Sequence, residues 1–254
     1  MTTLVQDLAQ LAARYAGKRV IVTGGLGFVG SNLVHVLVGL GSDVTVVDSL
    51  VPDTGASREN LAGVEHAVHV CIADIGDDAS LSPLVAECDI VFNLAARTSH
   101  LESVRDPLAD LHANAGAQLS LLEVCRRENP AGRILYGSTR QIYGRPQYLP
   151  VDERHPVVPL DPNAVSKYAG ERYHMLYGQI HGLPVCALRM TNTYGPRMRV
   201  IDARQNFVGL WLRLVDEGGG ACGVRRRPAA PGPDLRRRRR RRAAARRRAQ
   251  ARRR

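Results

Sequence analysis

The chain has 254 residues, enough for one large α/β domain or for one domain and part of another. Its formal net charge of +11 is unevenly distributed. Residues 218–254 hold 16 arginines and a single acid, a net charge of +15, so residues 1–217 carry a net charge of −4. Residues 1–217 are therefore mildly acidic, so the positive net charge of the whole chain does not indicate that they bind nucleic acid.

Cysteine usage and hydropathy narrow the class of protein further. The five cysteines form no CxxC pair and have no nearby group of histidines, which favours buried thiols in a reducing compartment over disulfides or a metal site. No apolar run approaches the length of a membrane span, and polar residues interrupt the N-terminal stretch where a signal peptide has its apolar core. Leucines at helical spacing within residues 1–17 instead predict a short amphipathic helix. We expect a cytoplasmic protein with no metal and no membrane contact.

Strands and helices alternate along the next part of the chain. Short apolar runs, several rich in β-branched residues, predict six strands at Lys18–Thr23, Asp43–Asp48, Val64–Ala73, Asp89–Ala95, Arg133–Gly137 and Val185–Met190. Helical patterns separate most of them, at Phe28–Leu40, Leu81–Glu87, Pro107–Glu128 and Asn163–Ile180. Apolar strands that alternate with amphipathic helices predict a parallel sheet covered on both faces. The predicted fold class is a doubly wound α/β sheet over residues 18–190.

The end of the chain changes in character. Residues 191–217 include one more helical pattern, Ala203–Glu217, with the only tryptophan. From residue 218 onward, 32 of 37 residues are Gly, Ala, Arg or Pro, without helical or strand periodicity. Such a segment buries too little apolar surface to offset its ordering entropy, so residues 218–254 are predicted to be a disordered tail. Its amino acids are those of GC-rich codons, which favours a shifted reading frame from near Gly218 over a purposeful or an inert tail.

A glycine-rich turn follows the first predicted strand, where the sequence reads TGGLGFVG over residues 23–30. Glycines at Gly24 and Gly27 let backbone N–H groups approach a pyrophosphate, and Gly30 lets the next helix pack close to the strand. Asp48 ends the second strand, where a carboxylate accepts both hydroxyls of a ribose and would repel a 2′-phosphate. The pattern predicts a dinucleotide cofactor, NAD rather than NADP.

Further motifs extend the pattern in order over about residues 18–217: NLAA at 93–96, GSTRQIYG at 137–144, SKYAGE at 166–171 and LRMTNTYGPR at 188–197. Together with TGGLGFVG they resemble the extended short-chain dehydrogenase/reductases, the NAD-dependent nucleotide-sugar epimerases and dehydratases. The resemblance implies a Rossmann-like fold. It also implies that the substrate domain beginning at residue 191 is incomplete, because family members continue for about a hundred residues more.

The resemblance also implies roles for individual residues. Implied cofactor contacts are Gly24, Gly27, Phe28, Val29, Gly30, Asp48, Ser49, Asp74, Ile75, Leu94, Ala95, Ala96, Asn114 and Lys167. Implied substrate contacts are Thr98, Thr139 and Asn192, and the catalytic positions are Thr139, Asn163 and Lys167. In the family, NAD oxidises the sugar at C4, a tyrosine four residues before the lysine takes the hydroxyl proton, and an epimerase then returns the hydride to the other face.

Two positions of this chain depart from the family pattern. Asn163 stands where the family has its tyrosine base, and an amide does not ionise in the required range. Arg140 and Gln141 stand where the dehydratases have an Asp-Glu pair, which disfavours a 4,6-dehydratase. Lys167 remains as a base that acts through Thr139 or a water molecule, if its pKa is lowered.

Other candidate residues are given structural roles. Tyr143 follows Thr139 by four residues, but the resemblance implies that it packs structurally. His100, Glu102 and Arg105 are expected on the solvated face of a helix, although His100 lies close in sequence to the fourth strand.

The sequence therefore predicts an NAD-dependent nucleotide-sugar epimerase that acts at C4 and is impaired in this chain. Its expected substrate is a UDP- or dTDP-hexose, and the resemblance implies a homodimer formed through helices 107–128 and 163–180. Two alternatives remain open: a non-catalytic NAD-binding protein, and a nucleic-acid-binding protein that uses the arginine tail if that tail is genuine.

Overall fold

The computed structural model describes residues 10–200 and 207–216. The arginine-rich tail and most of the predicted N-terminal helix lie outside these residues, although residues 10–15 are helical. None of the helices in the described part of the chain combines the length and apolar character needed to cross a membrane.

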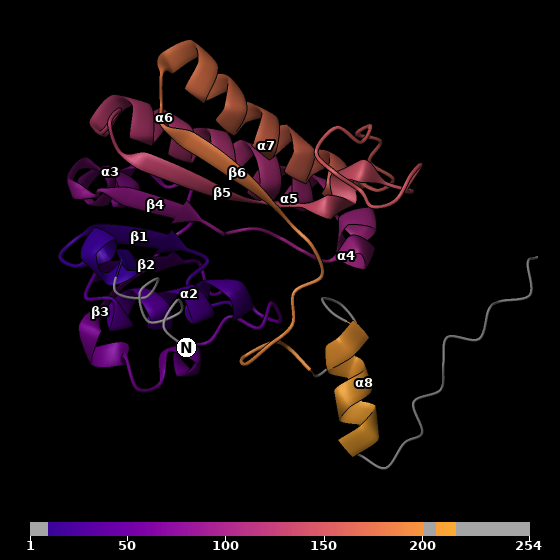
Figure 1. Ribbon diagram of the computed structural model, residues 1–254, viewed down its shortest axis with the longest axis horizontal. Coiled ribbons are helices and arrows are strands. Elements are labelled where there is room, and N and C mark those ends of the chain that lie inside the picture. Colours follow the sequence, from indigo (N-terminus) through magenta and orange to yellow (C-terminus); the bar gives the residue numbers. More distant parts are fainter. Residues whose placement is uncertain (1–9, 201–206, 217–254) are drawn as a thin grey trace, which may run out of the picture. The chain divides into compact units, whose positions relative to one another are not determined.

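Six parallel strands form a single sheet (Figure 1). The strands are β1 (Arg19–Thr23), β2 (Asp43–Asp48), β3 (Val68–Ile72), β4 (Ile90–Asn93), β5 (Arg133–Thr139) and β6 (Val185–Met190). Their order is β3-β2-β1-β4-β5-β6, and every neighbouring pair is parallel. The chain thus builds outward from β1 in one direction, returns to the middle at β4, and continues in the other direction. This order confirms the predicted doubly wound, Rossmann-like fold class.

Helices cover the sheet because side chains on the strands alternate between its two faces. On one face, Ile21 and Val91 pack in a core with residues of α3 (Asp78–Glu87) and α6 (Ala117–Glu128), and α7 (Pro162–His181) lies beside α6 (Figure 1). On the other face, Val20 and Val22 pack against α2 (Phe28–Gly39). Both cores consist mostly of buried aliphatic side chains, with Phe92 in the second and two cysteines in the first.

Several predicted bounds differ from the structure by one to three residues, and two predicted elements differ more. The predicted third strand begins four residues late, at Val68, because Glu65–Ala67 forms a turn of 3-10 helix instead. The long predicted helix at 107–128 consists of α5 (Pro107–Leu111), a π-helical turn (His112–Gly116) and α6. A π-turn inserts one extra residue into a helix and reorients the side chains that it carries.

Two further helices follow β4 and β6 in the chain. Helix α4 (His100–Arg105) follows β4, and α8 (Phe207–Asp216) lies within the predicted 203–217 helix. A 3-10 turn (Arg140–Tyr143) follows β5 directly.

Candidate active site

A cavity of about 890 Å³ lies at the carboxyl ends of the parallel strands. This is where an open α/β sheet binds ligands, at the point where the strand order reverses between β1 and β4. All the predicted contact and catalytic residues except Asn114 and Asn163 line it. These lining residues are Gly24, Gly27, Phe28, Val29, Gly30, Asp48, Ser49, Asp74, Ile75, Leu94, Ala95, Ala96, Thr98, Thr139, Lys167 and Asn192.

The glycine turn after β1 has room only for glycine. Gly24 has a φ of +66°, and a Cβ there would lie 2.9 Å from the backbone nitrogen of Ala95. A Cβ at Gly30 would lie 2.2 Å from the carbonyl oxygen of Gly24. Helix α2 begins directly after the turn, with Gly27 at its N-cap and no side chain capping its first N–H groups. The cradle therefore fits a pyrophosphate that approaches the backbone closely.

Asp48 organises the loops on both sides of this cradle. Its two carboxyl oxygens accept hydrogen bonds from the backbone N–H groups of Leu26, at 3.0 Å, and Leu50, at 2.9 Å. Burial raises the pKa of Asp48, while the two N–H groups act in the opposite direction. Each oxygen keeps a second acceptor position, so the residue can also accept a hydroxyl of a ribose.

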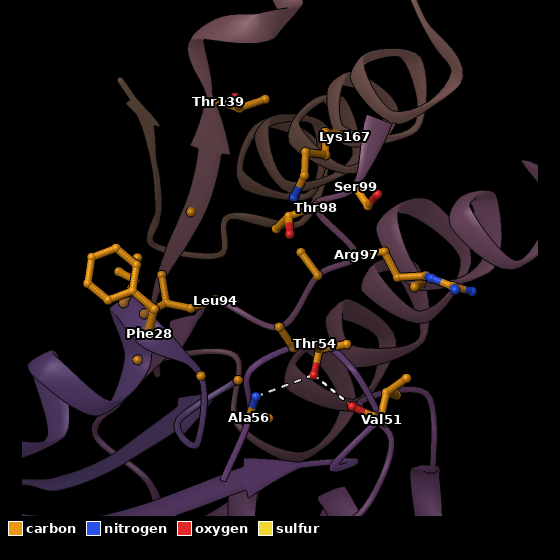
Figure 2. Close-up of a pocket in the computed structure, with 18 of the residues that line it drawn as sticks. Phe28, Val51, Thr54, Ala56, Leu94, Arg97, Thr98, Ser99, Thr139 and Lys167 are labelled. Carbon is orange, nitrogen blue, oxygen red and sulfur yellow. Dashed lines mark hydrogen bonds between the residues drawn. The ribbon is translucent and has the colours of Figure 1, made fainter. Parts of the chain in front are cut away.

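The other end of the cavity holds Thr139 and Lys167. Figure 2 shows the Lys167 side chain extending from α7 toward Thr98, with Thr139 on the end of β5. Lys167 is only 6% exposed. Burial lowers its pKa to about 8, and the negative charge of Asp110 limits that decrease. Thr139 accepts a hydrogen bond from the backbone N–H of Gln141 at 3.2 Å, which leaves its own hydroxyl proton to donate.

Asn163 is fully buried and does not line the cavity. Its amide nitrogen donates to Asp110 Oδ1 at 2.7 Å and to the backbone oxygen of Arg97 at 2.9 Å. Asn114, on the π-turn, donates to the same two acceptors at 3.0 and 3.1 Å. Both predicted asparagines thus hold the segment after β4 against α5, and neither of them lines the cavity.

Sequence reasoning missed Asp110, the acceptor shared by Asn114 and Asn163. Asp110 is 1% exposed, and its Oδ2 has no hydrogen-bond partner among the described residues. The available signal was its place four residues before Asn114, because residues at this spacing lie on one face of a helix.

His100 is exposed, as expected for a solvated helix face, and it also lines the cavity. Its Nδ1 lies 2.7 Å from Asp161 Oδ2, and its Nε2 lies 2.8 Å from the side-chain nitrogen of Gln141. Glu102 lines the cavity too, whereas Arg105 does not. Helical spacing could not reveal these contacts, because Gln141 and Asp161 come from segments far along the chain.

Tyr143 and Arg140, on the 3-10 turn after β5, each form a hydrogen bond with another side chain. Tyr143 does not line the cavity, and its hydroxyl accepts a hydrogen bond from Arg189 at 2.7 Å, as expected for a packing role. Arg140 does line it and donates to Asn192 Oδ1 at 3.0 Å. Within the described residues, no group of His, Cys, Asp and Glu side chains is arranged to hold a metal ion.

Comparison with known proteins identifies the family. The model of the "NAD dependent epimerase/dehydratase family" matches residues 20–227. A UDP-glucose 4-epimerase of Mycolicibacterium smegmatis is 36% identical over 183 residues, which cover 70% of this chain and 57% of that protein.

Solved structures agree with this family. A UDP-N-acetylglucosamine 4-epimerase from Methanobrevibacter ruminantium M1, in complex with UDP-N-acetylmuramic acid, has a TM-score of 0.75 and 31% identity, covering 80% of this chain and 64% of that one. A UDP-glucose 4-epimerase from Brucella ovis, in complex with NAD, has a TM-score of 0.65 and 28% identity, covering 75% of this chain and 56% of that one. The chain thus spans little more than half the length of the UDP-glucose 4-epimerase of Mycolicibacterium smegmatis. This chain belongs to the NAD-dependent epimerase/dehydratase family, whose cofactor is NAD.

Proposed function

We propose that this chain is the cofactor-binding part of a nucleotide-sugar epimerase that oxidises and re-reduces a sugar carbon, C4, of a UDP- or dTDP-hexose. The observation that carries the proposal is the single cavity with the glycine cradle and Asp48 at one end and Thr139 and Lys167 at the other. The names of the similar proteins, two UDP-glucose 4-epimerases and a UDP-N-acetylglucosamine 4-epimerase, support the substrate class.

The cofactor would extend along the cavity. The turn from Gly24 to Gly30, with Phe28 and Val29 at the start of α2, would hold the pyrophosphate. Asp48 and Ser49 would bind the ribose on the adenine side, Asp74 and Ile75 would contact the adenine, and Leu94, Ala95 and Ala96 would line the nicotinamide end. When bound, NAD supplies reversible hydride transfer.

Lys167 and Asn114 would act beside the nicotinamide in different ways. The buried Lys167 ammonium would donate hydrogen bonds to ribose hydroxyls, since its pKa of about 8 leaves it mostly protonated at neutral pH. Asn114 would act indirectly, because its amide holds the backbone of Arg97, and Arg97 leads into Thr98 in the lining of the cavity.

The substrate would lie against Thr98, Thr139 and Asn192. Thr139 would donate its hydroxyl proton and so orient the reacting hydroxyl of the sugar. Arg140 and Gln141 line the cavity beside it and supply no carboxyl group for loss of water, which argues for epimerisation over dehydration.

Turnover should be impaired because Asn163 replaces the tyrosine base. Loss of a general base costs about 10²–10⁴ in rate, which corresponds to roughly 3–5 kcal/mol of barrier. The same residue favours a second candidate function, a non-catalytic NAD-binding protein, because its amide is occupied by Asp110 and Arg97.

One experiment separates the two functions. NAD binding to the full chain is measured by calorimetry, and the NAD-loaded protein is then incubated with UDP-glucose, UDP-N-acetylglucosamine and dTDP-glucose. Epimerised sugar separated by chromatography, together with transient nicotinamide absorbance, supports the epimerase. NAD binding with no product across this panel supports the non-catalytic protein, and absence of NAD binding contradicts both.

We further propose a homodimer formed through α5 and α7. Leu108 and Leu111 on α5 and Val165 and Ile180 on α7 are exposed apolar side chains, between 49% and 77% accessible. The two helices contact each other, and Val165 lies in the first turn of α7 while Ile180 lies in its last. Exposed apolar groups of this kind are typical of protein–protein contacts.

A further inference from the structure

A histidine held by a carboxyl group lies at the sugar end of the cavity. His100 is the first residue of α4, and its Nδ1 lies 2.7 Å from Asp161 Oδ2. Asp161 is the N-cap of α7, where its other oxygen accepts the N–H of Ala164 at 2.8 Å. The helix therefore fixes the carboxyl group in place. With the Nδ1 proton directed at Asp161, a neutral imidazole presents its Nε2 lone pair as a proton acceptor.

Gln141 is the neighbour of that Nε2 atom. Its side-chain nitrogen lies 2.8 Å from His100 Nε2, while its Oε1 is buried without a hydrogen-bond partner among the described residues. The amide nitrogen of Gln141 therefore occupies the acceptor position of His100 Nε2 in this structure, and a substrate hydroxyl that donates to Nε2 would take its place. A half-turn of the amide would then place Oε1 to accept a hydrogen bond from the charged imidazolium.

The imidazole is close to the residue expected to orient the sugar. The backbone N–H of Gln141 donates to Thr139 Oγ1 at 3.2 Å, so the partner of His100 is also the partner of Thr139. His100, Thr139 and Gln141 all line the cavity that contains the proposed cofactor cradle. His100 thus shares both the cavity and the partner Gln141 with Thr139, beside which a sugar hydroxyl would react.

We propose that His100, held by Asp161, is the catalytic residue that takes the proton of the sugar hydroxyl in place of the tyrosine missing at position 163. This inference rests on the proposed epimerase function. The O–H bond breaks and its proton passes to His100 Nε2, while the hydrogen on the same carbon leaves with its electron pair to oxidised NAD. Re-reduction of the ketone returns the hydride to carbon and the proton from Nε2 to oxygen.

Lys167 is the competing base, and its surroundings favour the charged form. Its pKa of about 8 lies above neutral pH, and the negative charge of Asp110 helps to keep the ammonium protonated. An ammonium has three donors and no lone pair, which suits it to hold hydroxyl groups. The neutral imidazole, by contrast, has an acceptor atom, Nε2, whose neighbour Gln141 also lines the cavity.

The test uses His100→Gln in the full, NAD-loaded chain, with His66→Gln as the matched control. His66 is exposed and lines no part of the cavity. We expect H100Q to lower kcat by about 10²–10⁴-fold with NAD affinity unchanged, and H66Q to leave kcat unchanged. An H100Q variant with the wild-type kcat would overturn the proposal.

A second comparison distinguishes a base from a structural residue. In an Asn163→Tyr background the restored phenol would take the proton, so H100Q should then cost less than about tenfold. An equal loss in both backgrounds would show that His100 acts only through the structure and would overturn the proposal.

A binding readout keeps the proposal testable if turnover is too slow to measure. The imidazole resonances assigned through H100Q should shift when UDP-glucose is added to the NAD-loaded chain, and those of His66 should not. If UDP-glucose binds without moving the His100 signals, this inference fails and the proposed function stands. If neither NAD nor the nucleotide sugar binds, the proposed function fails and this inference falls with it.

Discussion

Replacement of Asn163 tests two things separately: whether a general base at this position restores turnover, and whether the asparagine stabilises the fold. Its amide nitrogen binds Asp110 and the backbone of Arg97, and its Oδ1 is buried without a hydrogen-bond partner in the described part of the chain. Asp110 Oδ1 keeps the hydrogen bond from Asn114 when Asn163 is replaced. The site should therefore tolerate substitution at a cost of about 1–3 kcal/mol in the free energy of unfolding.

We predict that Asn163→Tyr raises the kcat of the His100→Gln variant by about 10²–10⁴-fold, because the phenol restores a general base four residues before Lys167. Asn163→Phe is the matched control, since it has nearly the same volume without the hydroxyl group. Steady-state epimerisation of UDP-glucose and denaturant unfolding are measured for both variants. Equal kcat values for the two variants, with both folded and bound to NAD, would show that the missing base is not what limits this chain.

At the scale of elements, α4, α5 and α7 act together on the cavity. Asp161 at the start of α7 binds His100 on α4, and Asn163, two residues further along, reaches Asp110 on α5. Helix α7 thus contacts two helices, α4 and α5, that follow each other much earlier in the chain. A dimer contact through α5 and α7 would therefore restrain the two helices that carry Asp110 and Asn163.

We predict that a Leu108→Glu, Val165→Glu double variant converts a dimer to a monomer, because it places charges on two exposed apolar positions, 77% and 54% accessible. The control is Val36→Glu on α2, where a valine is 55% exposed away from α5 and α7. Sedimentation of the three proteins gives their masses. A wild-type chain that sediments as a monomer, or a double variant that still dimerises, would contradict the proposed interface.

At the scale of the whole molecule, charge divides the sequence into two parts. The net charge of +15 on residues 218–254 contrasts with −4 on the rest of the chain. We predict that deletion of residues 218–254 weakens binding to random RNA and removes most of its salt dependence, because clustered arginines bind phosphates by releasing counterions. NAD affinity should remain unchanged, since the described cavity lies before residue 200.

Fluorescence anisotropy at two salt concentrations, with and without the deletion, measures this effect. If RNA affinity is the same for both chains, the tail does not bind nucleic acid. Translation of the encoding DNA in all three frames across codons 205–254 tests the frame-shift hypothesis independently. A second open frame that continues for about a hundred residues would support it.

The sequence by itself determined the fold class, the family and the residues that line one end of the cavity. For these features, the conformation of a turn and the end of a strand can be predicted from the nearby sequence. The glycine turn needs Gly24 and Gly30 because backbone atoms fill the space of a Cβ, and Asp48 ends a strand whose neighbour is set by parallel pairing. Thr139 also ends a strand of this sheet, so its place at the cavity follows from the same pairing.

Only the tertiary structure decided the contacts of His100 and Asn163. His100 meets Asp161 across 61 residues, and Asn163 reaches Asp110 across 53. Such contacts depend on how the helices pack and on the π-turn before α6, and a hydrophobic period encodes which face of a helix is buried but not which side chain meets it. This is why the sequence predicted the exposure of His100 but not its contacts with Asp161 and Gln141.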